Sequence, residues 1–266
     1  MIHRLYDTKS YNNYLQSHFS REHLFDTLSH EANGLELHEA QLGFVADSGE
    51  ELTGIFTFDI YEEDRLLEKH KWLSDSEAAC REMLDYLKEQ YPSYQAEFTF
   101  SPQNELLKAL LKEFGADIFP EQQNMKLHAL PALCDTDGIE LLSEPYREQY
   151  YALHHHGDDN YWTGEMIVAE PETFHVLVAL EGDCVVGYLD FTHCEEINNI
   201  ADLYVSEQSR RKGYGAKLMA KALEMNAPKG MTLQVDVDNS PARRLYERMG
   251  FQRVEGENFI DARWSI

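Results

Sequence analysis

The sequence contains few cations for its length. Its 266 residues include 23 Lys and Arg against 48 Asp and Glu, which gives a formal net charge of -25. Such a charge repels polyanions, so we expect neither nucleic acid nor a membrane surface as a partner. The same field favours a cationic substrate such as an amine, although an acidic surface can also serve solubility alone.

Long apolar runs and paired cysteines are also missing. No run approaches the roughly 18 residues that a membrane span requires, and Met1–Thr8 lacks the apolar core of a signal peptide. No Cys-x-x-Cys pair occurs among the four cysteines, which are Cys80, Cys134, Cys184 and Cys194. We therefore expect a cytoplasmic protein with reduced, unpaired thiols.

The sequence does contain enough apolar material for two cores. It is 43% hydrophobic and 12% aromatic, and a chain of this length suits two domains of roughly 130 residues each. Turn-forming residues gather at positions 131–138, where we place the join. The predicted domains span residues 1–130 and 139–266.

One layout, a strand followed by a short helix and a terminating glycine, occurs twice. Asn239 precedes a helical pattern that ends at Gly250, and Asn104 precedes a similar pattern that ends at Gly115. Both pairs are 135 positions apart (239 − 104 and 250 − 115). Together with alternating strands and hairpin turns, this predicts two tandem copies of an α+β domain, each a mixed, mostly antiparallel sheet flanked by helices.

The second half carries a feature that the first half lacks, a basic loop over residues 206–215. Three cations at 210–212 are followed by Gly213 and Gly215, at the predicted start of a helix. Free N–H groups, the helix dipole and the missing glycine side chain favour an anion there, above all phosphate. The spacing matches neither a P-loop nor a dinucleotide fingerprint, and an ordinary basic turn is the plain alternative. The corresponding first-half segment, 71–83, has acids in place of the cations and no glycine.

Two blocks of the second half resemble the motifs of the GNAT superfamily of N-acetyltransferases. Residues 203–219 (LYVSEQSRRKGYGAKLM) contain its Arg/Gln-x-x-Gly-x-Gly/Ala core, and residues 239–251 (NSPARRLYERMGF) resemble its Asn-x-x-Ala-x-x-x-Tyr-x-x-x-Gly-Phe block. The blocks stand in the family's order, about 25 residues apart, and the resemblance covers 139–266. The first half resembles the family in layout alone: the loop is missing and Leu111 stands where Tyr246 stands in the second copy. It looks like a degenerate copy that has lost cofactor binding.

The resemblance implies acetyl-coenzyme A as acetyl donor, with its diphosphate on the loop and its pantetheine arm beside the preceding strand. In this family an amine attacks the thioester, a backbone N–H stabilises the oxyanion, and a tyrosine protonates the departing thiolate. Tyr246 matches that tyrosine, and a core aromatic is the alternative; Asn239 matches a pantetheine contact, and a helix cap is the alternative. The residues implied to bind the cofactor are Leu203, Tyr204, Val205, Arg210, Arg211, Lys212, Gly213, Tyr214, Gly215, Ala216, Asn239 and Ala242.

An acceptor amine must lose a proton before it can attack, so a base is needed. Asp202 resembles the carboxylate of members that acetylate polyamines or small amines, whereas the position where other members carry a base is Asn199 here. The alternative for Asp202 is a solvated strand residue. Residues 154–165, which mix histidines, acids and aromatics, are expected to line the acceptor pocket. A plain polar loop is the main alternative, and we expect no metal, although His155 and Asp159 have a helical ligand spacing.

Two functions stay open at this stage. The first is an enzyme that transfers acetyl from acetyl-CoA to a primary amine of a small molecule, such as an amino acid or a polyamine. The second is a non-catalytic module with the same fold that binds an acyl-CoA or a partner. The presence of Tyr246 together with Asp202 favours the enzyme. The oligomeric state is left open, with a homo-oligomer among the alternatives.

Overall fold

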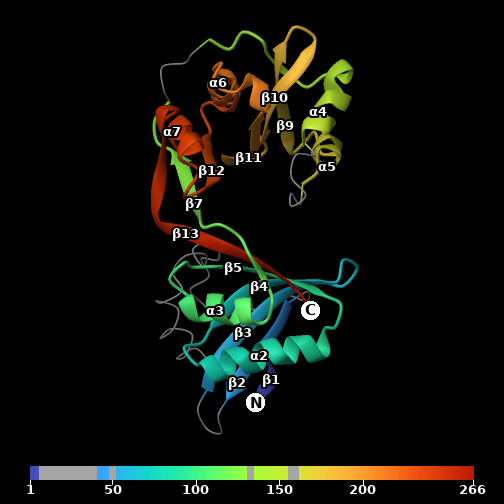
Figure 1. Cartoon of the computed structure of the whole chain (residues 1–266), viewed down its shortest axis with the longest axis vertical. Helices are drawn as coiled ribbons and strands as arrows, with labels where there is room; N and C mark the ends of the chain where they lie inside the picture. The colour runs from blue at the N-terminus through green and yellow to red at the C-terminus, as the bar shows by residue number, and fades with distance from the viewer. Residues whose placement is uncertain (6–40, 48–51, 131–134, 155–161) are drawn as a thin grey trace. The chain divides into compact units, whose positions relative to one another are not determined.

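The structure is a computed structural model that describes residues 1–5, 41–47, 52–130, 135–154 and 162–266 (Figure 1). The chain divides into two compact units. Unit 1 comprises Met1–Gln122 together with Glu255–Ile266, and unit 2 comprises Gln123–Val254. Each unit combines a mixed, mostly antiparallel sheet with helices, which confirms the predicted α+β fold class.

Unit 1 is built on a sheet in which β4 and β5 run parallel and the neighbouring described pairs run antiparallel. Helices α2 (Glu77–Gln90) and α3 (Glu105–Glu113) bury their apolar faces in a core rich in aromatic rings. In strand order the sheet contains β1 (Ile2–Leu5), β2 (Gln41–Asp47), β3 (Leu52–Tyr61), β4 (Leu66–Leu73), β5 (Gln95–Phe100) and β13 (Phe251–Ser265), and β6 (Asp117–Ile118) pairs with β13.

Unit 2 repeats this plan, with β11 and β12 as its parallel pair. Its strand order is β8 (Ile139–Leu141), β9 (Phe174–Glu181), β10 (Cys184–Thr192), β11 (Ile197–Val205), β12 (Gly230–Asp236) and β7 (Gln122–Leu127), followed by β13. Its α-helices are α4 (Arg147–His154), α5 (Gly164–Ala169), α6 (Tyr214–Asn226) and α7 (Ser240–Arg248), and the short 3-10 turns are η3 (Glu144–Tyr146) and η4 (Glu207–Ser209). The predicted apolar face of α6 is buried, with Leu218, Met219, Ala222 and Leu223 at most 1% exposed.

The compact units differ from the predicted linear boundaries at two strands. β13 leaves the unit in which it begins, because Ile260–Ser265 pair with Phe100–Gln95 of β5 in unit 1. Conversely, most of β7 belongs to unit 2, although it lies within predicted domain 1–130. The physical reason is that alternation in a strand fixes which side chains are buried, not which sheet supplies the hydrogen-bonding partner.

The predicted repeat has the same geometry in both copies. Asn104 (φ −81°, ψ 67°) and Asn239 (φ −74°, ψ 67°) each cap a helix, and their side chains accept from the N–H groups of Leu107 and Ala242. The terminating glycines, Gly115 and Gly250, are both left-handed, at φ 83° and 88°. Local backbone geometry therefore agrees with two copies of one domain.

Both sheets also carry a register shift at the same point. It follows Thr57 in the β3–β4 pair and Asp190 in the β10–β11 pair. Immediately before the shift, Thr57 lies opposite Lys71 and Asp190 lies opposite Asp202. These two cross-strand pairs are therefore equivalent positions of the two units.

The parallel pair of unit 2 separates after a few residues. β11 is in register with β12 over Ile197–Ile200, opposite Gly230–Leu233, but it stays paired with β10 as far as Val205. Beyond Ile200, β11 therefore has an open edge on the side away from β10. Unit 1 shows the same separation, since β4 pairs with β5 over Leu66–Glu68.

The described cysteines form no disulfide: Cys184 and Cys194 are exposed and Cys80 is buried, while Cys134 lies outside the described residues. In the part of the chain that the structure covers, no helix has both the length and the apolar character needed to cross a membrane.

Candidate active site

The main chain before α6 leaves a row of N–H groups unused. The backbone is left-handed at Arg211 (φ 64°) and Gly213 (φ 93°), and Gly213 caps α6 without a side chain. Among the described residues, none accepts a hydrogen bond from the amides of Arg211 through Gly215. Successive donors at the positive end of a helix dipole are a typical site for phosphate groups.

The three cations of the loop are not all available to an anion. Lys212 Nζ contacts both carboxylate oxygens of Glu181 at 3.0 Å, which lowers the pKa of that carboxyl. Arg210 Nε donates to the carbonyl of Val205 at 3.0 Å. Arg211 is exposed and meets no partner within the described ranges. The local positive charge is therefore smaller than the sequence predicts, and Arg211 is the cation left for an anion.

The two glycines of the loop have different surroundings. A Cβ atom on Gly213 would have no neighbouring protein atom within 4 Å, so this position faces open space. A Cβ atom on Gly215 would lie 3.2 Å from Leu245 Cδ2 of α7. Gly213 therefore allows close approach to the amides, whereas Gly215 mainly allows α6 to pack against α7, a difference that the sequence did not show.

The open edge of β11 adjoins this loop. The N–H of Ser206 donates to the carbonyl of Val186 at 2.9 Å. Every second residue of β11, counted back from Ser206, is therefore a position whose backbone groups hydrogen-bond to β10. Because antiparallel positions alternate, the backbone groups of Leu203 and Val205 point away from β10. They point toward the side from which β12 has separated.

Two of these edge groups already have partners. The Leu203 N–H donates to Asp202 Oδ1 at 2.7 Å, and the Val205 carbonyl accepts from Arg210. The Leu203 carbonyl and the Val205 N–H have no hydrogen-bond partner in the described part of the chain. An extended ligand could pair with these two groups as an added strand does.

Tyr246 lies on the inner face of α7, 8% exposed, where it packs with the core that includes Phe251. Burial, with a further contribution from the charge of Asp202, raises the pKa of the Tyr246 phenol to about 12. No described group hydrogen-bonds its hydroxyl. Tyr246 is thus a core aromatic, which was the alternative to a catalytic tyrosine. The two are compatible, because a protonated hydroxyl can serve as an acid.

The cap interpretation of Asn239 is likewise what the structure shows, since its Oδ1 accepts from the Ala242 N–H at 3.2 Å. A pantetheine contact by Asn239 or Ala242 stays a prediction. Tyr214 and Ala216 are partly buried and pack on the apolar core beneath α6.

Asp202 is not the solvated strand residue that was its alternative. Its Oδ2 accepts from the Tyr188 hydroxyl at 2.5 Å, and its Oδ1 accepts from the Leu203 N–H. It is partly exposed, in contrast to Tyr188, which is fully buried. Asn199, at the position where members of the resembled family carry a base, is exposed, and its Oδ1 accepts from Thr232 Oγ1 at 3.4 Å.

Sequence reasoning missed a buried polar cluster next to Asp202. Asp190 is 0% exposed, and its Oδ2 accepts from Tyr150 at 3.0 Å and lies 3.1 Å from His154 Nε2. Burial raises the pKa of Asp190 to about 6, opposed by His154. Burial alone would lower the pKa of His154, but the hydrogen bond and charge of Asp190 raise it. The available signal was an aspartate within the otherwise apolar strand VVGYLDF.

Of the predicted acceptor segment, only its ends are described. His154 lies in the buried cluster, and Thr163 caps α5 by accepting from the Met166 N–H at 3.3 Å. His155 and Asp159 lie outside the described residues. Among the residues that are described, no group of His, Cys, Asp and Glu has the arrangement of a metal site.

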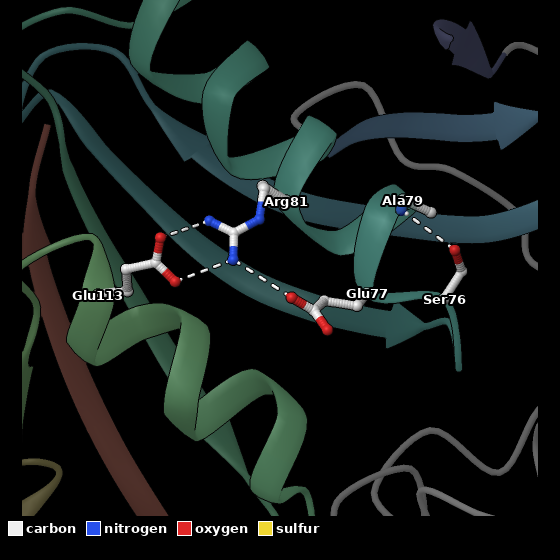
Figure 2. A network of polar contacts seen from close by, with 5 residues as sticks. All are labelled: Ser76, Glu77, Ala79, Arg81 and Glu113. Carbon is white, nitrogen blue, oxygen red and sulfur yellow. Dashed lines mark hydrogen bonds and ion pairs between the residues drawn. The ribbon is translucent and has the colours of Figure 1, made fainter.

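In unit 1 the protein's own side chains fill the place that corresponds to the loop. The Ser76 hydroxyl caps α2 by accepting from the Ala79 N–H at 3.2 Å, and Glu77 puts a carboxylate in the first turn (Figure 2). Arg81 is directed to Glu113, at 2.6 Å, and to Glu77 (Figure 2). Because the Ala79 amide and the Arg81 cation have protein partners, and Glu77 adds a negative charge, this helix N-terminus is poorly suited to a diphosphate.

Comparison with known proteins identifies similar acetyltransferases. Residues 138–251 match the model of the acetyltransferase (GNAT) family. Two curated relatives are a mycothiol acetyltransferase from Amycolatopsis mediterranei, 36% identical over 81 residues, and a probable N-acetyltransferase from Mycobacterium tuberculosis, 37% identical over 70 residues. The matches cover 30% and 26% of this chain, and they span only 26% and 39% of the relatives' own length.

Solved structures show the same fold over most of the chain. A GCN5-related N-acetyltransferase from Sphaerobacter thermophilus has a TM-score of 0.59 at 15% identity, covering 90% of this chain and 84% of that one. A tandem GNAT protein from the clavulanic acid biosynthesis pathway has a TM-score of 0.51 at 14% identity, covering 85% and 84%. This likeness concerns the fold alone, and it extends over both units. The chain thus has a tandem GNAT-like fold, and its residues 138–251 match the model of the GNAT acetyltransferase family.

Proposed function

We propose that this chain transfers an acetyl group from acetyl-CoA to a primary amine of a small molecule. The observation that carries the proposal is the row of unused amides from Arg211 to Gly215 at the start of α6. These donors and the unpaired Arg211 side chain fit a diphosphate. The open edge at Leu203 and Val205 fits an extended arm that ends near Asp202 and Tyr246.

Acetyl-CoA supplies an activated thioester, and the chain's own residues manage the protons. An ammonium substrate loses one proton before its nitrogen attacks, with Asp202 as the carboxylate placed to receive it. The C–N bond forms, the C–S bond breaks, and the nitrogen loses a second proton. Tyr246, whose pKa of about 12 keeps it protonated at neutral pH, gives its proton to the thiolate and regains one afterwards. One proton is released in net.

The first test is a calorimetric titration of the whole chain with acetyl-CoA. We expect one equivalent per chain, because the helix N-terminus of unit 1 is already capped. Arg211→Glu should weaken binding at least tenfold, since it replaces the unpaired cation with an anion. Arg253→Glu makes the same charge change at an exposed position of β13 and serves as the matched control.

The second test is thiol release from acetyl-CoA in the presence of a panel of primary amines. Transfer to any of them supports the enzyme. Binding of acetyl-CoA without transfer or slow hydrolysis would instead favour a non-catalytic module. Absence of acetyl-CoA binding would refute the enzyme and leave only a module that binds another acyl-CoA or a partner.

A further inference from the structure

Two carboxylates face each other across β10 and β11 of unit 2. Asp190 and Asp202 are register partners in a hydrogen-bonded position of the ladder, where Cα atoms are about 5.5 Å apart. Like charges at opposing positions destabilise a sheet. The pair therefore needs positive charge close by.

Asp190 is buried with part of its hydrogen-bonding capacity unused. Its Oδ2 contacts Tyr150 and His154, as described above, whereas its Oδ1 has no hydrogen-bond partner within the described chain. A buried carboxylate oxygen without a donor is unfavourable, because it has lost water and gained nothing in return. A positive charge held close to Asp190 would offset part of this penalty.

This cluster has two carboxylates but only one described group that can carry a positive charge, so one negative charge is not balanced. When His154 is protonated it balances Asp190, but no described cation forms an ion pair with Asp202. Asp202 is also the partly exposed member, so the cluster opens to the outside there. Among the described residues, the titratable groups that interact with this cluster are Tyr150, Tyr151 and His154 from α4, Glu165 from α5, Tyr188 and Asp190 from β10, Asp202 from β11 and Tyr246 from α7.

The fold itself does not require two acids here. At the equivalent point of unit 1, Thr57 lies opposite Lys71, and both are buried. A lysine side chain therefore brings an ammonium group to the place where unit 2 has Asp202. The acidic pair occurs in the unit that also has the loop with unused amides.

We propose that Asp190 and Asp202 bind the ammonium group of the acceptor, and that this site takes one compact primary ammonium. The inference rests on the proposed function and names the residues that select its substrate. Asp202 contacts the ammonium directly, and Asp190 supplies a second negative charge behind it. Tyr150 and His154 are positioning residues that orient Asp190.

The neighbouring groups favour a cationic head rich in N–H donors. Each oxygen of Asp202 has one protein donor, from Tyr188 or Leu203, and can accept another hydrogen bond. The Tyr204 ring lies 6.0 Å from the Tyr188 ring and has the Arg210 guanidinium over it at 5.8 Å, so this aromatic wall already accommodates a cation. A quaternary ammonium has no N–H and cannot donate to the remaining acceptor positions of Asp202.

Amine binding can be measured by NMR separately from acetyl transfer. The whole chain is labelled with 13C at histidine, and the His154 signal is identified by its loss in His154→Gln. We titrate with n-butylamine, 1,4-butanediamine and phenethylamine, and with n-butanol and butyltrimethylammonium for comparison. We expect a saturable shift of the His154 signal with the three amines, none with the alcohol, and weaker binding of the quaternary ion.

Variants test whether the carboxylates carry the binding. Asp190→Asn and Asp202→Asn each remove one charge at nearly constant shape, and each should weaken amine binding about tenfold or more. Asp261→Asn is the control, because Asp261 is a partly buried carboxyl of unit 1 that accepts from the Thr99 hydroxyl at 2.6 Å. In turnover assays the KM for the amine should rise while the KM for acetyl-CoA stays the same. Asp202 is partly exposed, so its variant remains informative if Asp190→Asn fails to fold.

The inference is overturned by any of three results: no shift with all three amines, an equal shift with n-butanol, or unchanged amine binding in the folded variants. Its failure can be told apart from failure of the proposed function. If the chain binds acetyl-CoA but no amine, only the acceptor site proposed here is refuted. Amine binding without acetyl transfer would support the acceptor site and refute the proposed enzymatic activity.

Discussion

Gly213→Ala tests the loop with a single added carbon. At φ 93° an alanine is strained, which should cost about 1–2 kcal/mol of folding free energy. The new Cβ would touch no protein atom, so it adds no clash and lies in open space beside the loop. If a diphosphate oxygen lies there, at least one charge-assisted hydrogen bond is lost. Such a bond contributes about 1.5–3 kcal/mol, so acetyl-CoA affinity should fall about 10- to 100-fold.

Gly115→Ala is the matched control. Gly115 has φ 83° and also no protein atom within 4 Å of a Cβ, but it ends α3 in unit 1. Calorimetry with acetyl-CoA and urea denaturation are run on both variants and on the parent chain. We expect similar losses of stability but a loss of affinity in Gly213→Ala alone. Unchanged affinity in Gly213→Ala, or an equal loss in both variants, would refute the assignment of the loop to the diphosphate.

Three further predictions concern the acid, the capped helix and the buried carboxylate. Tyr246→Phe should lower kcat about 100-fold or more while calorimetry shows little change in acetyl-CoA affinity, because the phenol supplies a proton and its ring stays packed; an unchanged kcat would exclude this role. Ser76→Ala should lower the free energy of unfolding by about 1 kcal/mol in urea denaturation and leave the acetyl-CoA stoichiometry at one, and a second equivalent would contradict the assignment of a single site. Burial raises the pKa of Asp190 from 3.8 to about 6, so its ionisation destabilises the fold as pH rises through that window. The difference in unfolding free energy between Asp190→Asn and the parent chain should therefore shift in favour of the variant by about 1–3 kcal/mol from pH 4 to pH 7. A difference that does not change with pH would contradict this prediction.

The two units differ locally at the anion site that we propose. The helix N-terminus of α2 is satisfied by Ser76 and Glu77, whereas that of α6 has Gly213, which provides no side chain. The cross-strand pair Thr57–Lys71 likewise replaces Asp190–Asp202. Both changes remove features that we assign to binding and leave the sheet plan in place.

Features carried by neighbouring residues were predictable. The helix caps at Asn104 and Asn239, the left-handed Gly115 and Gly250, and the start of a helix after a glycine loop all depend on a few consecutive residues. Local sequence also fixed the 135-residue offset between the copies. What it could not show is the partner of each loop cation, because Glu181, which binds Lys212, lies 31 residues away.

By itself, the sequence determined the fold class, the tandem repeat and the loop at the start of α6, since these follow from side-chain periodicity, capping residues and glycines whose effects act over one or two turns. Tertiary structure alone decided that β13 completes the sheet of unit 1 and that Asp190 meets Asp202, Tyr150 and His154 in a buried cluster. Strand pairing and burial join residues far apart in the chain, and a run of alternating residues contains no record of which distant strand or helix will lie beside it.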